Sequence, residues 1–182
     1  MNLFERFRRF LTSRGFGVHS PFAFRFITEI VGERYAYYGY DDIETAIEKH
    51  PEERKLRRHS RLLLRIAGRI GIDTAILAGD APFAIKAAVE GAGKRIRIIS
   101  PEAKTIGGKS LLLFAISQLP EGDALRATLN TDGSAIVVLK PAQSLKEELW
   151  ERMQCGILID GVGVLIAVVK KEIAKACYEI LI

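Results

Sequence analysis

From Ser60 onward, predicted helices alternate with short apolar strands, and this alternation limits the possible folds more than any other feature of the chain. A helix predicted over 60–70 precedes a strand at 74–79, and a helix over 82–91 precedes a strand at 95–100. Such an alternation is typical of βαβ units, in which each helix crosses over between two parallel strands. The pattern therefore predicts an α/β fold with a mostly parallel sheet.

The second half of the chain continues this pattern and then departs from it. A helix is predicted over 108–118, an edge strand at 124–129, a strand at 134–140 and a helix at 144–154. Three apolar runs follow, GILID, GVGVLIAVVKK and CYEILI, with no long helix between them. Strands joined by short connections pair in opposite directions, so we expect an antiparallel C-terminal hairpin.

Residues 1–60 differ in composition from the rest of the chain. Seven of the nine phenylalanines precede residue 27, and four of the five tyrosines lie between Tyr35 and Tyr40. Phenylalanines and leucines at helical spacing, with arginines between them, predict an amphipathic first helix, and Ser20-Pro21 predicts the start of a second. We expect a helical, aromatic-rich N-terminal cap over 1–60 and a sheet-bearing core over 61–182, within one compact domain.

Composition is that of a globular protein, with 48% hydrophobic and 27% charged residues. Cys155 and Cys177 match no disulfide framework or zinc spacing, and we expect both to be buried apolar residues. Arginines interrupt the first apolar stretch, which excludes a signal-peptide core, and no apolar run approaches the ~20 residues that span a bilayer. A cytoplasmic location is the expectation.

The N-terminal third carries a motif of unusual specificity. The stretch RGFGVHSPFAFRFITEIVGERYAYYGYDDIE contains Gly-x-His-Ser-Pro-Phe before a helix and a tyrosine-rich turn. It resembles the N-terminal helical segment of bacterial class I S-adenosylmethionine-dependent methyltransferases of the O-methyltransferase-like type. The later stretches RLLLRIAGRIGIDTAILAGD, LKEELWERM and IDGVGVLIAVVKKEIAKACYEILI are similar to further segments of that family. The resemblance implies a Rossmann-like methyltransferase sheet, shortened in the middle by roughly one βα unit.

The resemblance also implies where a cofactor would lie, over the carboxyl ends of the first two strands. Gly79 and Asp80 follow the first strand, and Ser100 and Glu102 follow the second, so these four are the candidate residues for S-adenosylmethionine. The family pattern of two glycines is reduced to one, with Pro82-Phe83 in place of small residues. The cofactor loop is therefore eroded.

Catalytic groups are harder to find in the sequence. The strand at 134–140 ends in Lys140-Pro141, without the carboxylate that serves metal or substrate in related O-methyltransferases. Asp132 and Asp160 are expected in turns. His19 in the best-matched motif either acts over a pocket or stabilises the helix start, and we favour the structural role. We assign no catalytic residue and no metal site.

A competing motif lies between the second predicted strand and the next predicted helix. Residues 103–110, AKTIGGKS, satisfy a relaxed phosphate-loop pattern in which Lys109 and Ser110 would meet phosphate and magnesium. Ala103 replaces the first glycine of that pattern. We favour a surface turn here over a nucleotide-binding loop.

Two functions therefore follow as expectations. The first is a methyltransferase-like protein with weak or no catalysis, and the alternative is a non-catalytic binding or regulatory partner of a complete methyltransferase. The aromatic cap would then pair with a second copy or a paralogue. Residues 1–65 hold 13 Lys and Arg against 9 Asp and Glu, a modest excess that does not indicate a nucleic acid. The first helix could lie on a membrane, but packing on protein explains it more simply.

Overall fold

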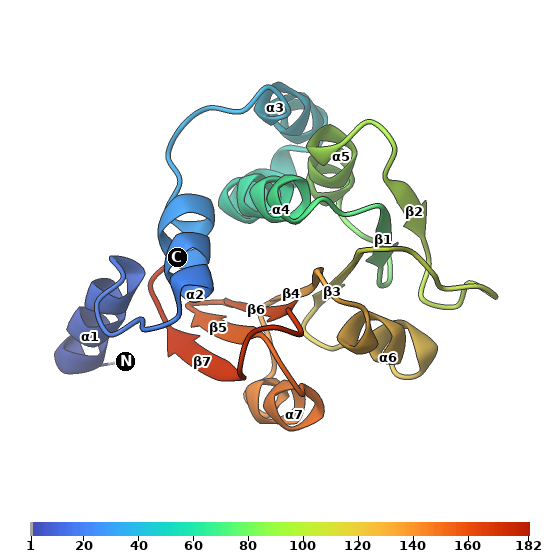
Figure 1. Ribbon diagram of the computed structural model, residues 1–182. Coiled ribbons are helices and arrows are strands. Elements are labelled where there is room, and N and C mark those ends of the chain that lie inside the picture. The colour runs from blue at the N-terminus through green and yellow to red at the C-terminus, as the bar shows by residue number, and fades with distance from the viewer. Residues whose placement is uncertain (1) are drawn as a thin grey trace.

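In the computed structural model, which describes residues 2–182, the chain forms one seven-stranded sheet (Figure 1). The strands are β1 Thr74–Leu77, β2 Arg97–Ile99, β3 Leu111–Ile116, β4 Ser134–Leu139, β5 Ile157–Gly161, β6 Val164–Val169 and β7 Ala176–Glu179. They lie in the order β2-β1-β3-β4-β6-β5-β7. The α/β fold and the mostly parallel sheet predicted from the alternation are confirmed.

The strand directions bring most of the strand ends to one side. β2, β1, β3 and β4 are mutually parallel, β6 is antiparallel to both β4 and β5, and β7 is parallel to β5. The predicted antiparallel C-terminal hairpin is therefore β5–β6. Because only β6 runs the other way, β1 to β5 and β7 all end at the same edge of the sheet, which we call the carboxyl edge.

Helices cover both faces of the sheet (Figure 1). One face carries α2 (Pro21–Arg25), the π-helix η1 (Phe26–Val31), α4 (Arg57–Ile70) and α5 (Phe83–Ala92), with α3 (Tyr40–Lys49) packed on α5 and the 3₁₀ helix η2 (Pro51–Leu56) leading into α4. The other face carries α6 (Asp123–Asn130) and α7 (Leu145–Arg152). Successive strand residues point to opposite faces of the sheet, so each face has its own hydrophobic core. Phe114 lies in the core on the α4 face, and Leu113 lies in the core on the α6 face.

The helix starts follow the local chemistry of the sequence. Ser20 is the N-cap of α2, where its hydroxyl accepts a hydrogen bond of 3.3 Å from the amide of Ala23, and Pro21 occupies the first helical position as predicted. The first helix, α1 (Leu3–Ser13), begins with a capping box between Asn2 and Glu5. It lies beside β7 at the end of the sheet and buries none of its residues (Figure 1).

The predicted helix over 108–118 is wrong, because this segment contains β3. The first five of the six residues LLLFAI are buried, and β3 pairs with β1 on one side and β4 on the other. A central strand covered on both faces has no polar side, so its apolar run carries neither the alternation of an exposed strand nor the stripe of a surface helix. Only the strand pairing decides its conformation.

The predicted edge strand at 124–129 is also wrong, since the segment lies in α6. Asp123 stands in the first turn, and Ala124, Leu125 and Thr128 are buried against the sheet at helical spacing. The connection from β2 to β3 consequently has no helix. Residues 100–110 cross as an irregular loop, and Ile106 of that loop packs on the core of the α6 face.

Candidate functional site

The four residues predicted for the cofactor meet at the carboxyl edge. Gly79 and Asp80 follow β1, Ser100 and Glu102 follow β2, and these two strands are parallel neighbours with Ile76 opposite Ile99. Gly79 has a φ of 71°, a left-handed conformation that favours glycine, and a Cβ built there would meet no atom within 4 Å. The turn after β1 therefore forms and leaves its backbone open.

All four of these residues are exposed. The Asp80 side chain is fully exposed, with its carboxylate 3.6 Å from the Lys86 ammonium, and Ser100 and Glu102 are exposed as well. β2 is a three-residue edge strand, with no helix after it to form a wall. None of the four lines any of the five cavities characterised among residues 2–182.

A side chain of the same protein closes the start of α5. The Glu53 carboxylate, from η2, accepts hydrogen bonds from the amide of Phe83 at 3.0 Å and from the amide of Ala84 at 2.8 Å. The first amides of a helix have no partner within the helix and commonly bind anionic ligand groups. At α5 that position is taken by Glu53.

The same contact is extended by an aromatic stack. The His50 ring lies parallel to the Phe83 ring, with centroids 3.8 Å apart and an interplanar angle of 4°. The Lys86 ammonium lies 5.4 Å from the centroid of the Phe83 ring. The Phe83 ring thus contacts His50, which precedes η2, and Lys86, which lies in α5 like Phe83 itself. These contacts keep η2 over the start of α5. The sequence did not indicate this contact between segments thirty residues apart.

The phosphate-loop interpretation of residues 103–110 fails on its context. The loop leads into β3 rather than into a helix, so the helix N-terminus that the motif requires is absent there. The amide of Lys109 donates to Asp73 at 2.7 Å, and the Ser110 hydroxyl donates to the carbonyl of Gly133. Both groups are engaged in joining the amino ends of neighbouring strands.

His19 and the two cysteines have no shared site. His19 is exposed and lines none of the five cavities, and Ser20, its neighbour, stabilises the start of α2. Cys155 is half-buried and Cys177 is exposed, so the expectation that both are buried is wrong. Cys177 lies on β7, an edge strand that is covered on one side only. Partial burial raises the pKa of its thiol, which disfavours the reactive thiolate.

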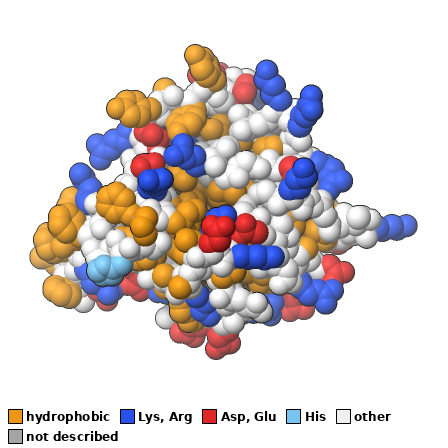
Figure 2. All heavy atoms as spheres, viewed as in Figure 1, with side chains coloured by type: hydrophobic (Ala, Val, Ile, Leu, Met, Phe, Trp, Pro, Cys, Tyr) orange, Lys and Arg blue, Asp and Glu red, His pale blue; other side chains and the backbone are white. Residues whose placement is uncertain are grey.

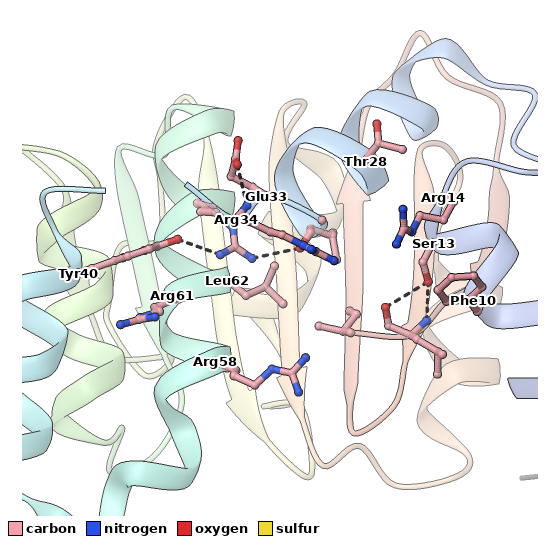
Figure 3. Close-up of a pocket in the computed structure, with 15 residues that line it drawn as sticks. Phe10, Ser13, Arg14, Thr28, Glu33, Arg34, Tyr40, Arg58, Arg61 and Leu62 are labelled. Atoms are coloured by element: carbon pink, nitrogen blue, oxygen red, sulfur yellow. Dashed lines mark hydrogen bonds between the residues drawn. The ribbon is translucent and has the colours of Figure 1, made fainter. Parts of the chain in front are cut away.

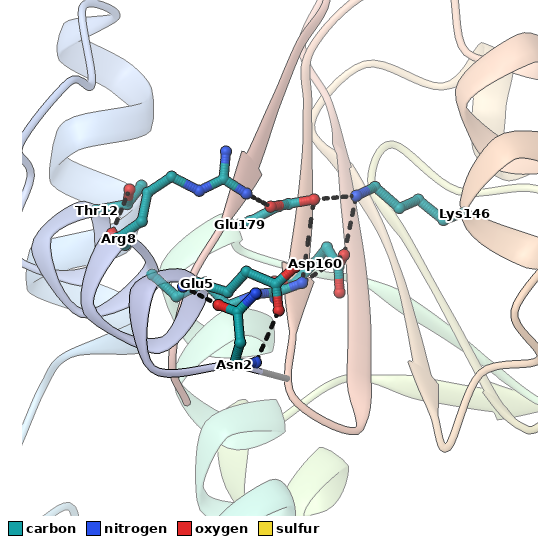
Figure 4. A network of polar contacts seen from close by, with 8 residues as sticks. Asn2, Glu5, Arg8, Thr12, Lys146, Asp160 and Glu179 are labelled. Atoms are coloured by element: carbon teal, nitrogen blue, oxygen red, sulfur yellow. Dashed lines mark hydrogen bonds and ion pairs between the residues drawn. The ribbon is translucent and has the colours of Figure 1, made fainter.

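An ionic cluster of five residues lies at the other end of the carboxyl edge: Arg8, Arg9, Lys146, Asp160 and Glu179 (Figure 4). The Lys146 ammonium of α7 is 2.9 Å from the Asp160 carboxylate of β5 and 2.7 Å from the Glu179 carboxylate of β7. Arg9 of α1 donates to the carbonyl of Asp160 at 2.8 Å and to its carboxylate at 3.2 Å. Asp160 was expected in a turn, and this is wrong, because it lies in β5 and binds two cations.

The cluster is saturated and therefore structural. Burial alone would raise the pKa of Asp160, but hydrogen bonds from Lys146 and Arg9 outweigh it, so this pKa is lowered. The Lys146 hydrogen bond lowers the pKa of Glu179, and burial opposes it only in part. Both carboxylates are thus ionised and paired at neutral pH, which excludes them as general acids. Their bonds to α1 attach that helix to the sheet.

A basic groove of about 640 Å³ lies near the ionic cluster (Figure 3). It lies between the end of α1, the end of η1 and the first half of α4, and the last two residues of the chain form part of its wall. Five arginines line it, against one glutamate: Arg14, Arg34, Arg58, Arg61, Arg65 and Glu33. We call it the arginine groove. The sequence indicated the basic character of this third of the chain but not that these side chains converge.

Within residues 2–182, no three histidine, cysteine or acidic side chains lie close enough to hold a metal ion, and no helix is long and apolar enough to cross a membrane. Comparison of the chain with protein-family models, with curated proteins and with solved structures gives no match in any of the three. The geometry described above is therefore the basis for a functional assignment.

Proposed function

We propose that this chain is a methyltransferase-related, Rossmann-like protein that acts by binding a second protein chain rather than by transferring a methyl group. The relation is supported by the parallel strands β1 to β4 and by the hairpin that places β6 antiparallel between β4 and β5. It is also supported by the Gly-x-His-Ser-Pro-Phe motif, which forms the predicted helix start at Ser20. Fold alone does not assign an activity, so the proposal rests on the site.

The contact between Glu53 and the first amides of α5 is the observation that carries the non-catalytic assignment. A ligand over the ends of β1 and β2 would need these amides or the open backbone of Gly79. S-adenosylmethionine carries a carboxylate, and at these amides it would meet the carboxylate of Glu53 at close range. Like charges at such a distance repel strongly.

The candidate residues do not otherwise fit that cofactor. Asp80 and Glu102 are exposed on an open edge, where a hydrogen bond to a ribose hydroxyl competes with water. The five cavities characterised among residues 2–182 lie elsewhere, so none of them would enclose the adenosyl group at this edge. We therefore derive no methyl-transfer step.

The outer face of α1 supports the binding role. α1 turns its polar side toward the protein, where Arg8 and Arg9 pair with Glu179 and Asp160. Its apolar side faces solvent, with Phe4 at 76% and Phe7 at 58% exposure. Figure 2 shows hydrophobic side chains gathered on the side of the molecule where Figure 1 places α1. This is the reverse of the usual orientation of an amphipathic helix in a globular protein.

The size of this surface suits a protein interface. Six large apolar side chains project from it and its continuation: Leu3, Phe4, Phe7, Phe10, Phe16 and Phe24. Together they present on the order of 600 Å², at the upper end of the ~300–600 Å² of the largest apolar patch on a typical monomer and approaching the ~800 Å² that each partner buries in a stable complex. The partner we propose is a second copy of this chain, since symmetric dimers are the commonest assemblies.

Thermal unfolding in the presence of S-adenosylmethionine and S-adenosylhomocysteine tests the non-catalytic assignment. We expect no change in the unfolding temperature of the natural protein at millimolar ligand, because a ligand that binds the folded state would raise it. A saturable rise that is lost in Asp80→Ala would contradict the proposal and establish the cofactor site. A rise that appears only in Glu53→Ala would identify Glu53 as the group that excludes the ligand.

A further inference from the structure

The arginine groove concentrates positive charge from three separate elements. Arg14 follows α1, Arg34 follows η1, and the remaining arginines come from α4. Within the described residues 2–182, Glu33 is the one acidic side chain that lines the groove, and it accepts hydrogen bonds from the amides of Arg34 at 2.7 Å and Tyr35 at 2.9 Å. The groove therefore has a large excess of cations over anions at its wall.

Two of these arginines are held in place by hydrogen bonds, and one of them, Arg65, has neutral acceptors only. Arg65 donates to the carbonyl of Ile30 at 2.8 Å, to that of Val31 at 3.2 Å and to the Tyr40 hydroxyl at 2.9 Å, all of them neutral acceptors. Arg61 pairs with Glu44 through one terminal nitrogen at 2.8 Å, but its buried Nε has no acceptor. A buried donor without a partner is costly and marks a position where an acceptor is missing.

The other three arginines are free to bind. Among residues 2–182, Arg14, Arg34 and Arg58 form no ion pair within 4.0 Å, and all three are exposed. Figure 3 shows Arg58 extending from α4 toward the side of the groove formed by Phe10, Ser13 and Arg14. Three unpaired guanidinium groups on opposite walls of one hollow suit a ligand group with more than one negative charge.

The first turn of α4 places further positive charge beside the groove. α4 begins at Arg57 with no acidic residue in its first turn, so two arginines, Arg57 and Arg58, stand at the positive end of the helix dipole. Cations are unfavourable at a helix N-terminus, where anions are stabilised. An anion in the groove would offset this repulsion.

The groove also has an apolar wall, formed by Phe10, Leu62, Leu181 and Ile182. A volume of about 640 Å³ lies within the range of small-molecule sites. We propose that the arginine groove binds a phosphate monoester that carries an apolar or aromatic body. The phosphate lies among Arg14, Arg34 and Arg58, and the body packs on the apolar wall. This site is separate from the edge of β1 and β2, and it shares Phe10 with the apolar surface of α1.

Titration calorimetry with phenyl phosphate and with inorganic phosphate tests the site on the full chain. We expect phenyl phosphate to bind roughly 10-fold more tightly than phosphate, because its ring buries apolar surface on the wall. Affinity for both should fall as salt is added, since exposed charges are screened. Absence of binding by both compounds at low salt would overturn the proposal.

A pair of neighbouring variants separates the groove from general surface charge. Arg58→Gln removes a lining cation and should weaken phenyl phosphate binding by roughly 10-fold or more. Arg57→Gln removes the same charge one residue away, but Arg57 pairs with Glu44 and does not line the groove, so binding should stay within roughly twofold. Equal losses in the two variants would overturn the proposal, provided that both unfold at the temperature of the natural protein.

A further arm distinguishes a soluble ester from a lipid headgroup as the source of the phosphate. The protein is sedimented with phosphatidylcholine vesicles that contain phosphatidic acid, and with vesicles of phosphatidylcholine alone. Cosedimentation that needs phosphatidic acid and is lost in Arg58→Gln supports the proposal with a lipid as the source. No cosedimentation, together with binding of phenyl phosphate, supports it with a soluble ester.

Discussion

The carboxylate of Glu53 accepts a hydrogen bond of 3.0 Å from the backbone amide of Phe83, and this contact closes the first turn of α5 with a side chain from η2. The second carboxylate oxygen accepts from Ala84, so both oxygens serve the helix start. A helix start that could bind an anionic ligand group thus has a structural role here.

Replacing Glu53 by alanine should lower the free energy of unfolding by about 1–2 kcal/mol, because two helix-start amides lose an acceptor and the helix loses an anion at its N-terminus. The measurement is urea unfolding followed by circular dichroism. Glu52→Ala is the matched control, since Glu52 is exposed and lies 3.6 Å from His50, whereas the hydrogen bonds to the first amides of α5 come from Glu53. It should change the free energy by less than about 0.5 kcal/mol. Equal losses in the two variants would show that the amides of α5 do not depend on Glu53.

The ionic cluster predicts a loss of stability in acid. The pKa of Asp160 and that of Glu179 are lowered in the folded protein, so the unfolded chain takes up protons first as the pH falls. The stabilisation is complete above the unfolded pKa values, near pH 4, and is lost as the pH falls through the lower folded values. We expect Asp160→Asn to be less stable than the natural protein at pH 7 and to lose less stability on acidification. Urea unfolding over a pH series measures both. Parallel curves would contradict the role of the cluster.

Lys146 contributes to the dependence of stability on pH at the alkaline end. Burial acts to lower its pKa, but its hydrogen bonds to Glu179 and Asp160 outweigh this and raise it. Its stabilisation is therefore complete below the unfolded pKa and is lost as the pH rises through the higher folded value. Lys146→Met should flatten the alkaline limb of the stability curve above about pH 10, and Lys86→Met, whose partner Asp80 is fully exposed, should leave it unchanged.

Self-association through α1 predicts a mass that depends on concentration. The double variant Phe4→Ser and Phe7→Ser should be monomeric where the natural protein is dimeric, and its thermal stability at low concentration should be unchanged, because both side chains are exposed. Sedimentation velocity over a range of concentrations measures this. Tyr35→Ser with Tyr38→Ser is the control, since these aromatic side chains are also exposed but lie outside α1. A natural protein that is monomeric at every concentration would refute the proposed dimer.

Two positions on the same face of β3 should differ in sensitivity because they differ in burial. Phe114 is fully buried between neighbours on β1 and β4, and Phe114→Ala should cost about 3–5 kcal/mol. Ile116 is 40% exposed at the end of the strand, and Ile116→Ala should cost roughly 1 kcal/mol. Urea unfolding of both variants gives the comparison, and similar losses at the two positions would be inconsistent with the burial of Phe114 between β1 and β4.

Much of the fold was determined by the sequence alone, because its signals are local. The cap at Ser20, the helix before β1, the strands β1, β4, β5 and β6 and the antiparallel hairpin all follow from caps, turns and apolar runs that act over a few residues. The candidate residues Gly79 and Ser100 also meet at one edge, because parallel neighbouring strands end together.

The tertiary structure alone decided the features that depend on distant partners. LLLFAI is a strand because β1 and β4 pair with it from both sides. A continuous apolar run has no hydrophobic periodicity, so the sequence does not indicate such pairing. Asp160 is a partner of Arg9, 151 residues away, and α1 presents its apolar face outward because those distant carboxylates bind its arginines. The five arginines of the groove converge because α1, η1 and α4 pack around one hollow. Local sequence sets the conformation of each element, but the side of it that faces the protein depends on the free energy of contacts that only the folded chain brings together.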